Sequence, residues 1–112
     1  MPPDTRKYLF DMQQAVLGIE MFVAAKTFDQ FMSDLMLRLA VERQFEILGE
    51  ALSQLSKIDP ALAAQIPEHP QIISFRNVLI HNYGKIDHSI MWKIIQERLP
   101  MLRQQLQAML SA

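Results

Sequence analysis

Apolar residues recur every three or four positions along almost the whole chain, and this spacing is the strongest constraint on its fold. The first series contains Tyr8, Met12, Val16 and Ile19 and predicts an amphipathic helix over residues 4–25. No segment alternates apolar and polar residues convincingly over four positions, so strands are not expected. The sequence therefore predicts an all-α protein.

Capping residues place the helix starts in the first half of the chain. Asp4 is the predicted cap of the first helix, and Thr27 is the predicted cap of the next. The apolar spacing then predicts one long helix over residues 28–55. Gly49 lies inside this helix at a cost of about 1 kcal/mol relative to Ala, and close packing of a neighbouring helix is the simplest reason for it.

Prolines and a glycine divide the second half. Asp59-Pro60 predicts a cap and the first position of a short helix that ends near residue 66. A further helix is expected from about Gln71 until Gly84 stops it. Asp87 is the predicted cap of the last helix, which Pro100 should interrupt. Together these elements predict an up-and-down bundle of four main helices plus a short helix.

Length and composition limit the class of protein. The chain has 112 residues, which suits a single domain over residues 1–112. It contains no Cys, which excludes disulfides, thiolate metal sites and a cysteine nucleophile. Eight Met and six Phe are many for so small a core. They suit a subunit contact, where Met and aromatic residues are enriched, as well as they suit the core alone.

The distribution of charge and hydropathy limits which classes of partner, nucleic acid or membrane, the chain can bind. Residues 1–75 carry six Lys and Arg against ten Asp and Glu, whereas residues 76–112 carry five against two. This modestly basic last third permits local phosphate recognition but does not resemble a strongly basic nucleic-acid-binding domain. The apolar runs are far shorter than the roughly 20 residues of a membrane-spanning helix, and no signal-peptide core follows the first residues. We expect a cytoplasmic protein without a membrane partner.

The histidines do not predict a metal site. His69 lies in a polar turn and is expected to contact solvent, and His88 is expected on the surface of the first turn after its cap. Together with His81 they form no recognisable metal-ligand spacing. A glycine-rich phosphate loop is also missing from the sequence. Neither a metal nor another cofactor is expected.

Residues 74–84 place four polar side chains on an otherwise apolar helix. At about 100° per residue, Arg76 and Tyr83 would lie within about 20° of each other around the helix axis. Asn77 and His81 are four residues apart and would share the adjacent stripe. From the residues alone, this cluster fits a functional site or an ordinary surface with a local Asn–His hydrogen bond.

Three glutamates follow one another at four-residue spacing on the predicted long helix. Glu42, Glu46 and Glu50 would repel one another mildly, which suggests a basic partner. Candidate partners are Arg38, Arg43 and Arg76. A solvated helix face is the favoured interpretation of the three carboxylates.

The polar segment resembles the signature of HEPN-domain ribonucleases, in which Arg is followed after four residues by His and after one more by Tyr. Arg76, His81 and Tyr83 occupy these positions. Further similarity to the HepT-like branch of that family lies in Ala40–Arg43, Ile47–Ala51, Asp87, Trp92 and Leu99-Pro100. The resemblance covers roughly residues 4–110. Glu68–Gln71 departs from it, since a Pro-Trp-like sequence is expected there.

The resemblance implies an all-α HEPN-like fold and a metal-independent endoribonuclease that acts as a homodimer. Arg76 would bind the scissile phosphate, His81 would transfer protons during attack by the ribose 2′-hydroxyl, and Asn77 would support them. The implied products are a 2′,3′-cyclic phosphate and a 5′-hydroxyl. The chain would be the toxin of a type VII toxin–antitoxin system. Its implied partner, a MntA-like minimal nucleotidyltransferase antitoxin, would add AMP to Tyr83 and block RNA from the site.

Two other functions suit the same fold. The chain could be a non-catalytic helical companion that presents substrate to a minimal nucleotidyltransferase, or a plain dimerisation module. Neither needs Arg76, His81 and Tyr83 together, so their presence favours the ribonuclease. The RNA target is not specified by the sequence.

Overall fold

The computed structural model describes residues 1–66 and 68–112, with Tyr83 described in its backbone only. In this part of the chain the regular structure is helical and contains no strand, which confirms the all-α prediction. The α-helices are α1 (Pro3–Val23), α2 (Phe28–Ser33), α3 (Leu35–Ile58), α4 (Pro60–Ala63), α5 (His69–His81), α6 (His88–Glu97) and α7 (Leu99–Ser111). A short 3₁₀ turn, η1, spans Tyr83–Lys85.

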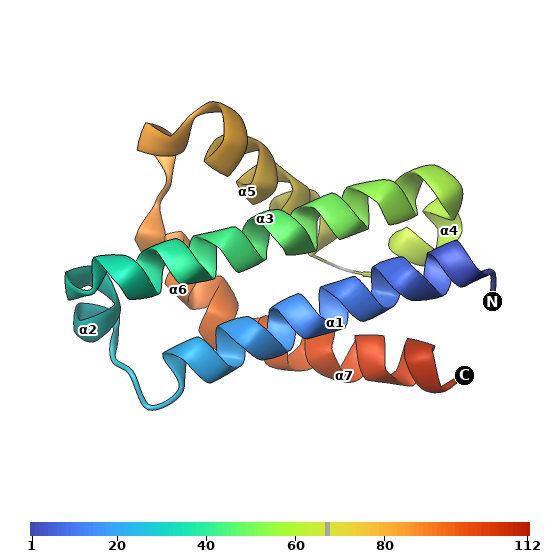
Figure 1. Ribbon diagram of the computed structural model, residues 1–112, viewed down its shortest axis with the longest axis horizontal. Coiled ribbons are helices and arrows are strands. Elements are labelled where there is room, and N and C mark those ends of the chain that lie inside the picture. Colours follow the sequence, from blue (N-terminus) through green and yellow to red (C-terminus); the bar gives the residue numbers. More distant parts are fainter. Residues whose placement is uncertain (67) are drawn as a thin grey trace.

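The longest helix, α3, lies at the centre of the bundle. It packs along α1 on one side and against α5 on another, and α7 in turn packs on α1 (Figure 1). The short helices α2 and α4 contact opposite ends of α3, and both chain termini lie at the α4 end. The contact between α3 and α1 anchors α3 in the bundle. Since α5 packs on α3, α3 determines the position of α5.

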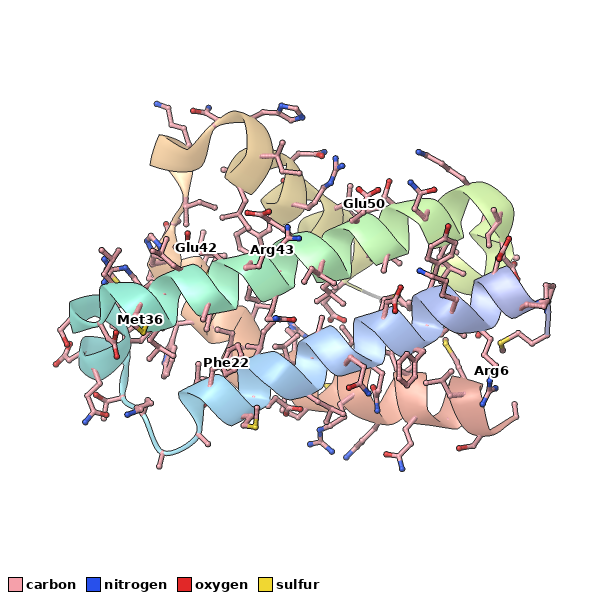
Figure 2. All side chains as sticks on the ribbon, viewed as in Figure 1. Arg6, Phe22, Met36, Glu42, Arg43 and Glu50 are labelled. Atoms are coloured by element: carbon pink, nitrogen blue, oxygen red, sulfur yellow. The ribbon has the colours of Figure 1, made fainter. Side chains whose placement is uncertain are left out.

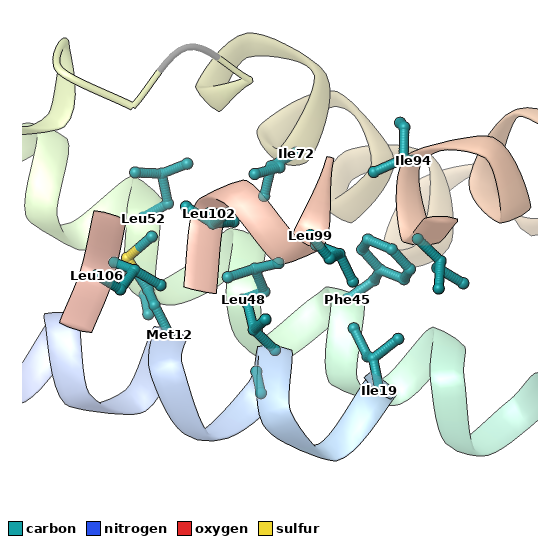
Figure 3. Packing of buried hydrophobic residues seen from close by; sticks show 14 of the residues in the cluster. Met12, Ile19, Phe45, Leu48, Leu52, Ile72, Ile94, Leu99, Leu102 and Leu106 are labelled. Carbon is teal, nitrogen blue, oxygen red and sulfur yellow. The ribbon is translucent and has the colours of Figure 1, made fainter. Parts of the chain in front are cut away.

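The apolar stripes of the long helices meet in one continuous core. Met12 and Ile19 of α1 face Phe45, Leu48 and Leu52 of α3, and all five are fully buried (Figure 3). Full burial of an aliphatic or aromatic side chain contributes about 1.5–3 kcal/mol. The three- and four-residue spacing in the sequence therefore identified the buried faces correctly.

The methionines divide between this core and the surface. Met12 and Met91 are fully buried, whereas Met1, Met21, Met32, Met36 and Met101 are exposed. The core alone therefore does not account for the high methionine content. Contact of the exposed methionines with a second subunit stays a prediction.

Several predicted helix boundaries are confirmed. The Thr27 side chain accepts a hydrogen bond from the Gln30 backbone, and the Gln30 side chain accepts one from the Thr27 backbone, which forms a capping box. Asp59 caps α4, with Pro60 at its first position. Asp87 caps α6 through hydrogen bonds from the Ser89 and Ile90 backbones. The last helix is interrupted at Arg98, two residues before Pro100.

Other predicted boundaries in the first half are wrong. The long helix over 28–55 is divided at Asp34, whose extended backbone ends α2 while its side chain caps α3, and α3 continues to Ile58. Asp4 does not cap α1, because the helix begins one residue earlier and places Asp4 inside the first turn. The short helix that was expected to reach residue 66 ends at Ala63.

The end of α5 also differs from the expectation. The helix ends at His81, and Asn82 follows it with a non-helical backbone (φ −152°, ψ 56°). Gly84 is therefore not the residue that stops the helix, and it lacks the positive φ of a glycine cap. It lies instead in η1. No helix in the described ranges is long and apolar enough to cross a membrane.

Candidate functional site

Hydrogen bonds hold both terminal nitrogens of the Arg76 guanidinium, one to Glu50 of α3 and one to Asn77 of α5. Its Nη2 donates to a carboxylate oxygen of Glu50 at 2.6 Å, and its Nη1 donates to Oδ1 of Asn77 at 3.0 Å. The Arg76 side chain keeps 26% of its surface exposed. Its Nε is buried and has no hydrogen-bond partner within the described residues. The guanidinium is therefore fixed in orientation, with part of its surface open to a ligand.

Gly49 makes this arrangement sterically feasible. A Cβ placed on Gly49 would lie 2.3 Å from the Cβ of Arg76 and 3.1 Å from the backbone oxygen of Ile72. Such a distance is far shorter than any van der Waals contact, so a side chain here would push α5 away from α3. The predicted close helix packing at Gly49 is confirmed, and the neighbour is the helix that carries Arg76.

A surface groove of about 600 Å³ adjoins the Arg76 guanidinium. It lies among α1, α3 and α5, and its walls carry paired charges of both signs together with the ring of Tyr8. Lys7 lies over that ring with its Nζ 5.1 Å from the ring centre. Figure 2 labels Arg43 and Glu50, which line the groove from α3. The groove therefore presents Arg76 among three basic and three acidic side chains.

The three glutamates of α3 each have a different basic partner. Glu50 pairs with Arg76, Glu46 pairs with Arg43 at 3.1 Å, and Glu42 pairs with His88 at 2.8 Å. The interpretation of a solvated face is wrong for the buried Glu42 but holds in part for Glu46 and Glu50, whose side chains are 29% and 47% exposed. Arg43 and Arg76 are confirmed as basic partners, whereas Arg38 donates instead to the backbone oxygen of Met32, and the partner of Glu42 is the unexpected His88. The pKa of Glu50 is lowered by a hydrogen bond from Gln54 and by the positive charge of Arg76.

His81 and Asn77 lie on the exposed side of α5. His81 is the last residue of the helix and is exposed, and Asn77 is also exposed. Five residues at about 100° each place the Arg76 and His81 side chains about 140° apart around the helix axis. The structure thus brings Asn77 to Arg76 and leaves His81 facing away from α3.

Tyr83 does not lie on the same helix as Arg76. Because α5 ends at His81, the expected angle of about 20° between Arg76 and Tyr83 does not apply, and that prediction is wrong. The backbone of Tyr83 begins η1. Its side chain lies outside what the structure describes, so its expected role as a modification site stays a prediction.

His88 differs most from its expected environment. Its Nε2 lies 2.8 Å from a carboxylate oxygen of Glu42, and only 22% of the His88 side chain and 4% of the Glu42 side chain are exposed. Its ring also lies 6.2 Å from the ring of Phe31. The expectation of a surface residue is therefore wrong, because α6 folds back on the first half of α3. This contact joins residues 46 positions apart, so no local sequence signal predicts it.

His69 is also less solvent-exposed than expected. It is the first residue of α5 and is partly buried, and its Nδ1 lies 3.2 Å from the backbone oxygen of Ile66. This contact secures the start of α5 to the turn before it. A structural role at the helix start is sufficient to explain His69.

Comparison with known proteins assigns the family. The profile described as ribonuclease HepT-like matches residues 12–109, which include Gly49, Glu50 and the whole of α5. The chain belongs to the HepT-like ribonuclease family. The resemblance seen in the sequence and the expected enzyme class, a ribonuclease, are thereby confirmed.

Curated relatives of this HepT-like chain carry names of the same kind. A protein of Thermococcus cleftensis named "Probable ribonuclease HepT" is 33% identical over 98 residues, covering 88% of each chain. Two proteins of Methanocaldococcus jannaschii, both named "Putative RNase", are similar. One is 28% identical over 106 residues, covering 93% of this chain and 94% of the relative. The other is 32% identical over 97 residues, covering 87% and 79%. No solved structure matches the chain significantly.

Proposed function

We propose that this HepT-like chain is a metal-independent endoribonuclease toxin that uses Arg76 and His81 to cleave RNA. The observation that carries the proposal is the family match across α5, combined with an arginine of that helix fixed beside an open groove. An arginine with both terminal nitrogens anchored is suited to bind a phosphate in a defined orientation, because its planar fork matches two phosphate oxygens.

In the proposed reaction, the ribose 2′-hydroxyl attacks the adjacent phosphorus and gives its proton to a general base. The bond from phosphorus to the 5′-oxygen breaks, and that oxygen takes a proton from a general acid. A 2′,3′-cyclic phosphate and a 5′-hydroxyl result. Histidine suits both roles because it exchanges protons near neutral pH. Arg76 would stabilise the charge that develops on the phosphorane oxygens, and Asn77 supports it by accepting its Nη1 hydrogen bond.

A homodimer is part of this proposal. Each chain supplies one signature histidine, so separate acid and base roles require a second chain or a water molecule. His81 is exposed at the end of α5 and faces away from the Arg76–Glu50 pair, which suits a site completed by another copy of α5. If the second role is taken by the His81 of another copy rather than by water, dimerisation is a condition of activity.

We further propose that a MntA-like minimal nucleotidyltransferase antitoxin neutralises the toxin by adding AMP to Tyr83. Tyr83 lies two residues after His81. An AMP group attached there would bring phosphate charge and a bulky base close to the end of α5. The added charge and bulk beside His81 would hinder approach of the RNA backbone, which is a physical route to inhibition.

Induced expression in a bacterial host tests the proposal. The wild type should arrest growth and produce new RNA ends, and Arg76→Ala and His81→Ala should do neither while accumulating to the same level. Coexpression with a MntA-like nucleotidyltransferase should restore growth and add the mass of AMP to the wild type but not to Tyr83→Phe. Intact RNA with well-folded wild-type protein would instead favour the non-catalytic companion of a nucleotidyltransferase.

A further inference from the structure

Glu50 contacts the proposed phosphate-binding residue but has no part in the cleavage steps given above. Its carboxylate lies 2.6 Å from Nη2 of Arg76, a distance typical of a strong charge-assisted hydrogen bond. The two residues come from different helices and are 26 positions apart. The Glu50 side chain is 47% exposed, so substrate in the groove can reach the same space.

The contact leaves a defined set of donors on Arg76. A guanidinium has five N–H groups, two on each terminal nitrogen and one on Nε. Glu50 takes one from Nη2, Asn77 takes one from Nη1, and Nε is buried. Among the described residues, one N–H group therefore remains without a partner on each terminal nitrogen, which is the number that a bidentate phosphate contact requires.

The neighbouring glycine makes this geometry specific. Gly49 allows the Cβ and Cγ of Arg76 to approach α3 closely, and Glu50 is the next residue on α3. The start of the arginine side chain and its charged end are thus both held by consecutive residues of one helix. A hydrogen bond from Gln54 to the Glu50 carboxylate, at 3.0 Å, orients the carboxylate in turn.

We propose that Glu50 is a positioning residue of the nuclease, whose carboxylate holds the Arg76 guanidinium in place for the substrate phosphate and offsets its charge until RNA binds. This inference rests on the proposed function. Two opposite effects follow from it. Removal of the carboxylate charge should strengthen binding of RNA in the ground state, because a competing anion is lost. The same change should slow cleavage, because the guanidinium loses its fixed orientation.

Glu50→Gln separates these effects, and Glu20→Gln is the matched control. Glu20 forms a similar ion pair between helices, with Arg103 at 2.8 Å, on α1 and α7. For Glu50→Gln we expect kcat to fall roughly tenfold or more, since misplacement of a positioning group by about 1 Å can cost about a hundredfold. A 2′-O-methyl RNA strand, which lacks the attacking hydroxyl, should bind about two- to tenfold more tightly. Glu20→Gln should change neither value by more than about twofold.

Glu50→Asp tests the two parts of the inference independently. It keeps the charge but withdraws the carboxylate by one methylene group, so kcat should fall without tighter binding of the 2′-O-methyl strand. An unchanged kcat in both Glu50 variants would overturn the inference. So would weaker strand binding by Glu50→Gln, or an equal loss of kcat in Glu20→Gln.

A readout without catalysis distinguishes failure of this inference from failure of the proposed function. Nuclear magnetic resonance of the Arg76 guanidinium should show separate, slowly exchanging Nη signals in the wild type and in Glu20→Gln. These signals should merge in Glu50→Gln as rotation of the group is freed. A wild type that cuts no RNA but shows this difference would refute the nuclease and retain the positioning contact. Identical Arg76 signals in all three proteins would overturn the role of Glu50.

Discussion

The two signature residues at either end of the polar segment of α5 have opposite environments. Arg76 is held by Glu50 and Asn77 and lies against Gly49 of α3. His81, five residues later, is exposed at the last position of the helix. The bundle of a single chain thus fixes the arginine side chain but leaves the histidine open. Under the proposed function, this difference would place phosphate binding within one chain and make proton transfer depend on a second copy.

The segment after His81, residues 82–88, contacts a different part of α3. His88 at the start of α6 binds the buried carboxylate of Glu42, two turns before Glu50 (Figure 2). The α3 helix therefore contacts the polar segment at two places. Gly49 and Glu50 contact Arg76 of α5, and Glu42 contacts His88, which follows the segment. Four predictions follow on how much each of these contacts contributes to the free energy of unfolding, and burial should raise the contribution.

Gly49→Ala should give the largest loss of stability. The new Cβ would lie 2.3 Å from the Arg76 Cβ, so α5 must move, and we expect the free energy of unfolding to fall by about 1–3 kcal/mol. Gly18→Ala is the control, because its Cβ would approach Gln44 no closer than 3.6 Å. That variant should be neutral or more stable by up to about 1 kcal/mol. Urea denaturation measures both, and equal effects would refute close packing at Gly49.

Glu42→Gln should follow, because it disturbs a buried hydrogen bond to His88. We expect a loss of about 0.5–1.5 kcal/mol in the free energy of unfolding, together with faster amide hydrogen exchange over residues 82–90. Glu46→Gln is the comparison, since its partner Arg43 is 67% exposed, and its loss should stay below about 0.5 kcal/mol. A similar loss in both variants would mean that burial of the Glu42–His88 pair adds nothing.

Arg76→Ala and His81→Ala should differ in stability even though both should lack nuclease activity. Removal of Arg76 deletes a partly buried ion pair, and we expect a loss of about 1 kcal/mol. Removal of the exposed His81 should change the free energy of unfolding by less than about 0.5 kcal/mol. Denaturation in urea measures the two values. A larger loss for His81 would contradict its open environment.

The smallest expected effect is the dependence of stability on pH through Glu50. The pKa of Glu50 is lowered in the folded chain, first by the hydrogen bond from Gln54 and then by Arg76, so the folded state releases this proton more readily than the unfolded state. Its contribution to stability is therefore present above the unfolded-state value of about 4.3 and is lost as pH falls through the lower folded-state value. The stability difference between wild type and Glu50→Gln should shrink as the pH falls below about 4.3. A constant difference would exclude this linkage.

The sequence predicts those features of the fold that local chemistry controls. Thr27 and Asp87 cap helices because their side chains reach backbone amides only two or three residues away. Apolar spacing likewise predicts the buried faces of the long helices. Asp34 was missed because the apolar spacing continues across it, although a capping residue occupies the break.

Contacts between helices could not be predicted from local spacing. The neighbour of Gly49 and the partners of Glu42 and Glu50 depend on how α5 and α6 pack on α3. The order of residues in the family signature predicts which residues form the candidate site. The contacts of Arg76 with Glu50 and Gly49 follow only from the packing of α5 on α3. The helix angle expected for Tyr83 is wrong because α5 ends at His81, before Tyr83, and no glycine signal in the sequence marks this end.

Cleavage of a labelled RNA by the purified protein tests the central claim most directly, namely that Arg76 and His81 form a ribonuclease site. The wild type should produce 2′,3′-cyclic phosphate and 5′-hydroxyl ends in the presence of a metal chelator. His81→Ala should be slower by at least about a hundredfold. An equal mixture with the wild type, once subunits exchange, should retain roughly a quarter of the activity of undiluted wild type, as expected if both chains of a dimer must be intact. Unchanged cleavage by His81→Ala, or ends that carry a 5′-phosphate, would contradict the account.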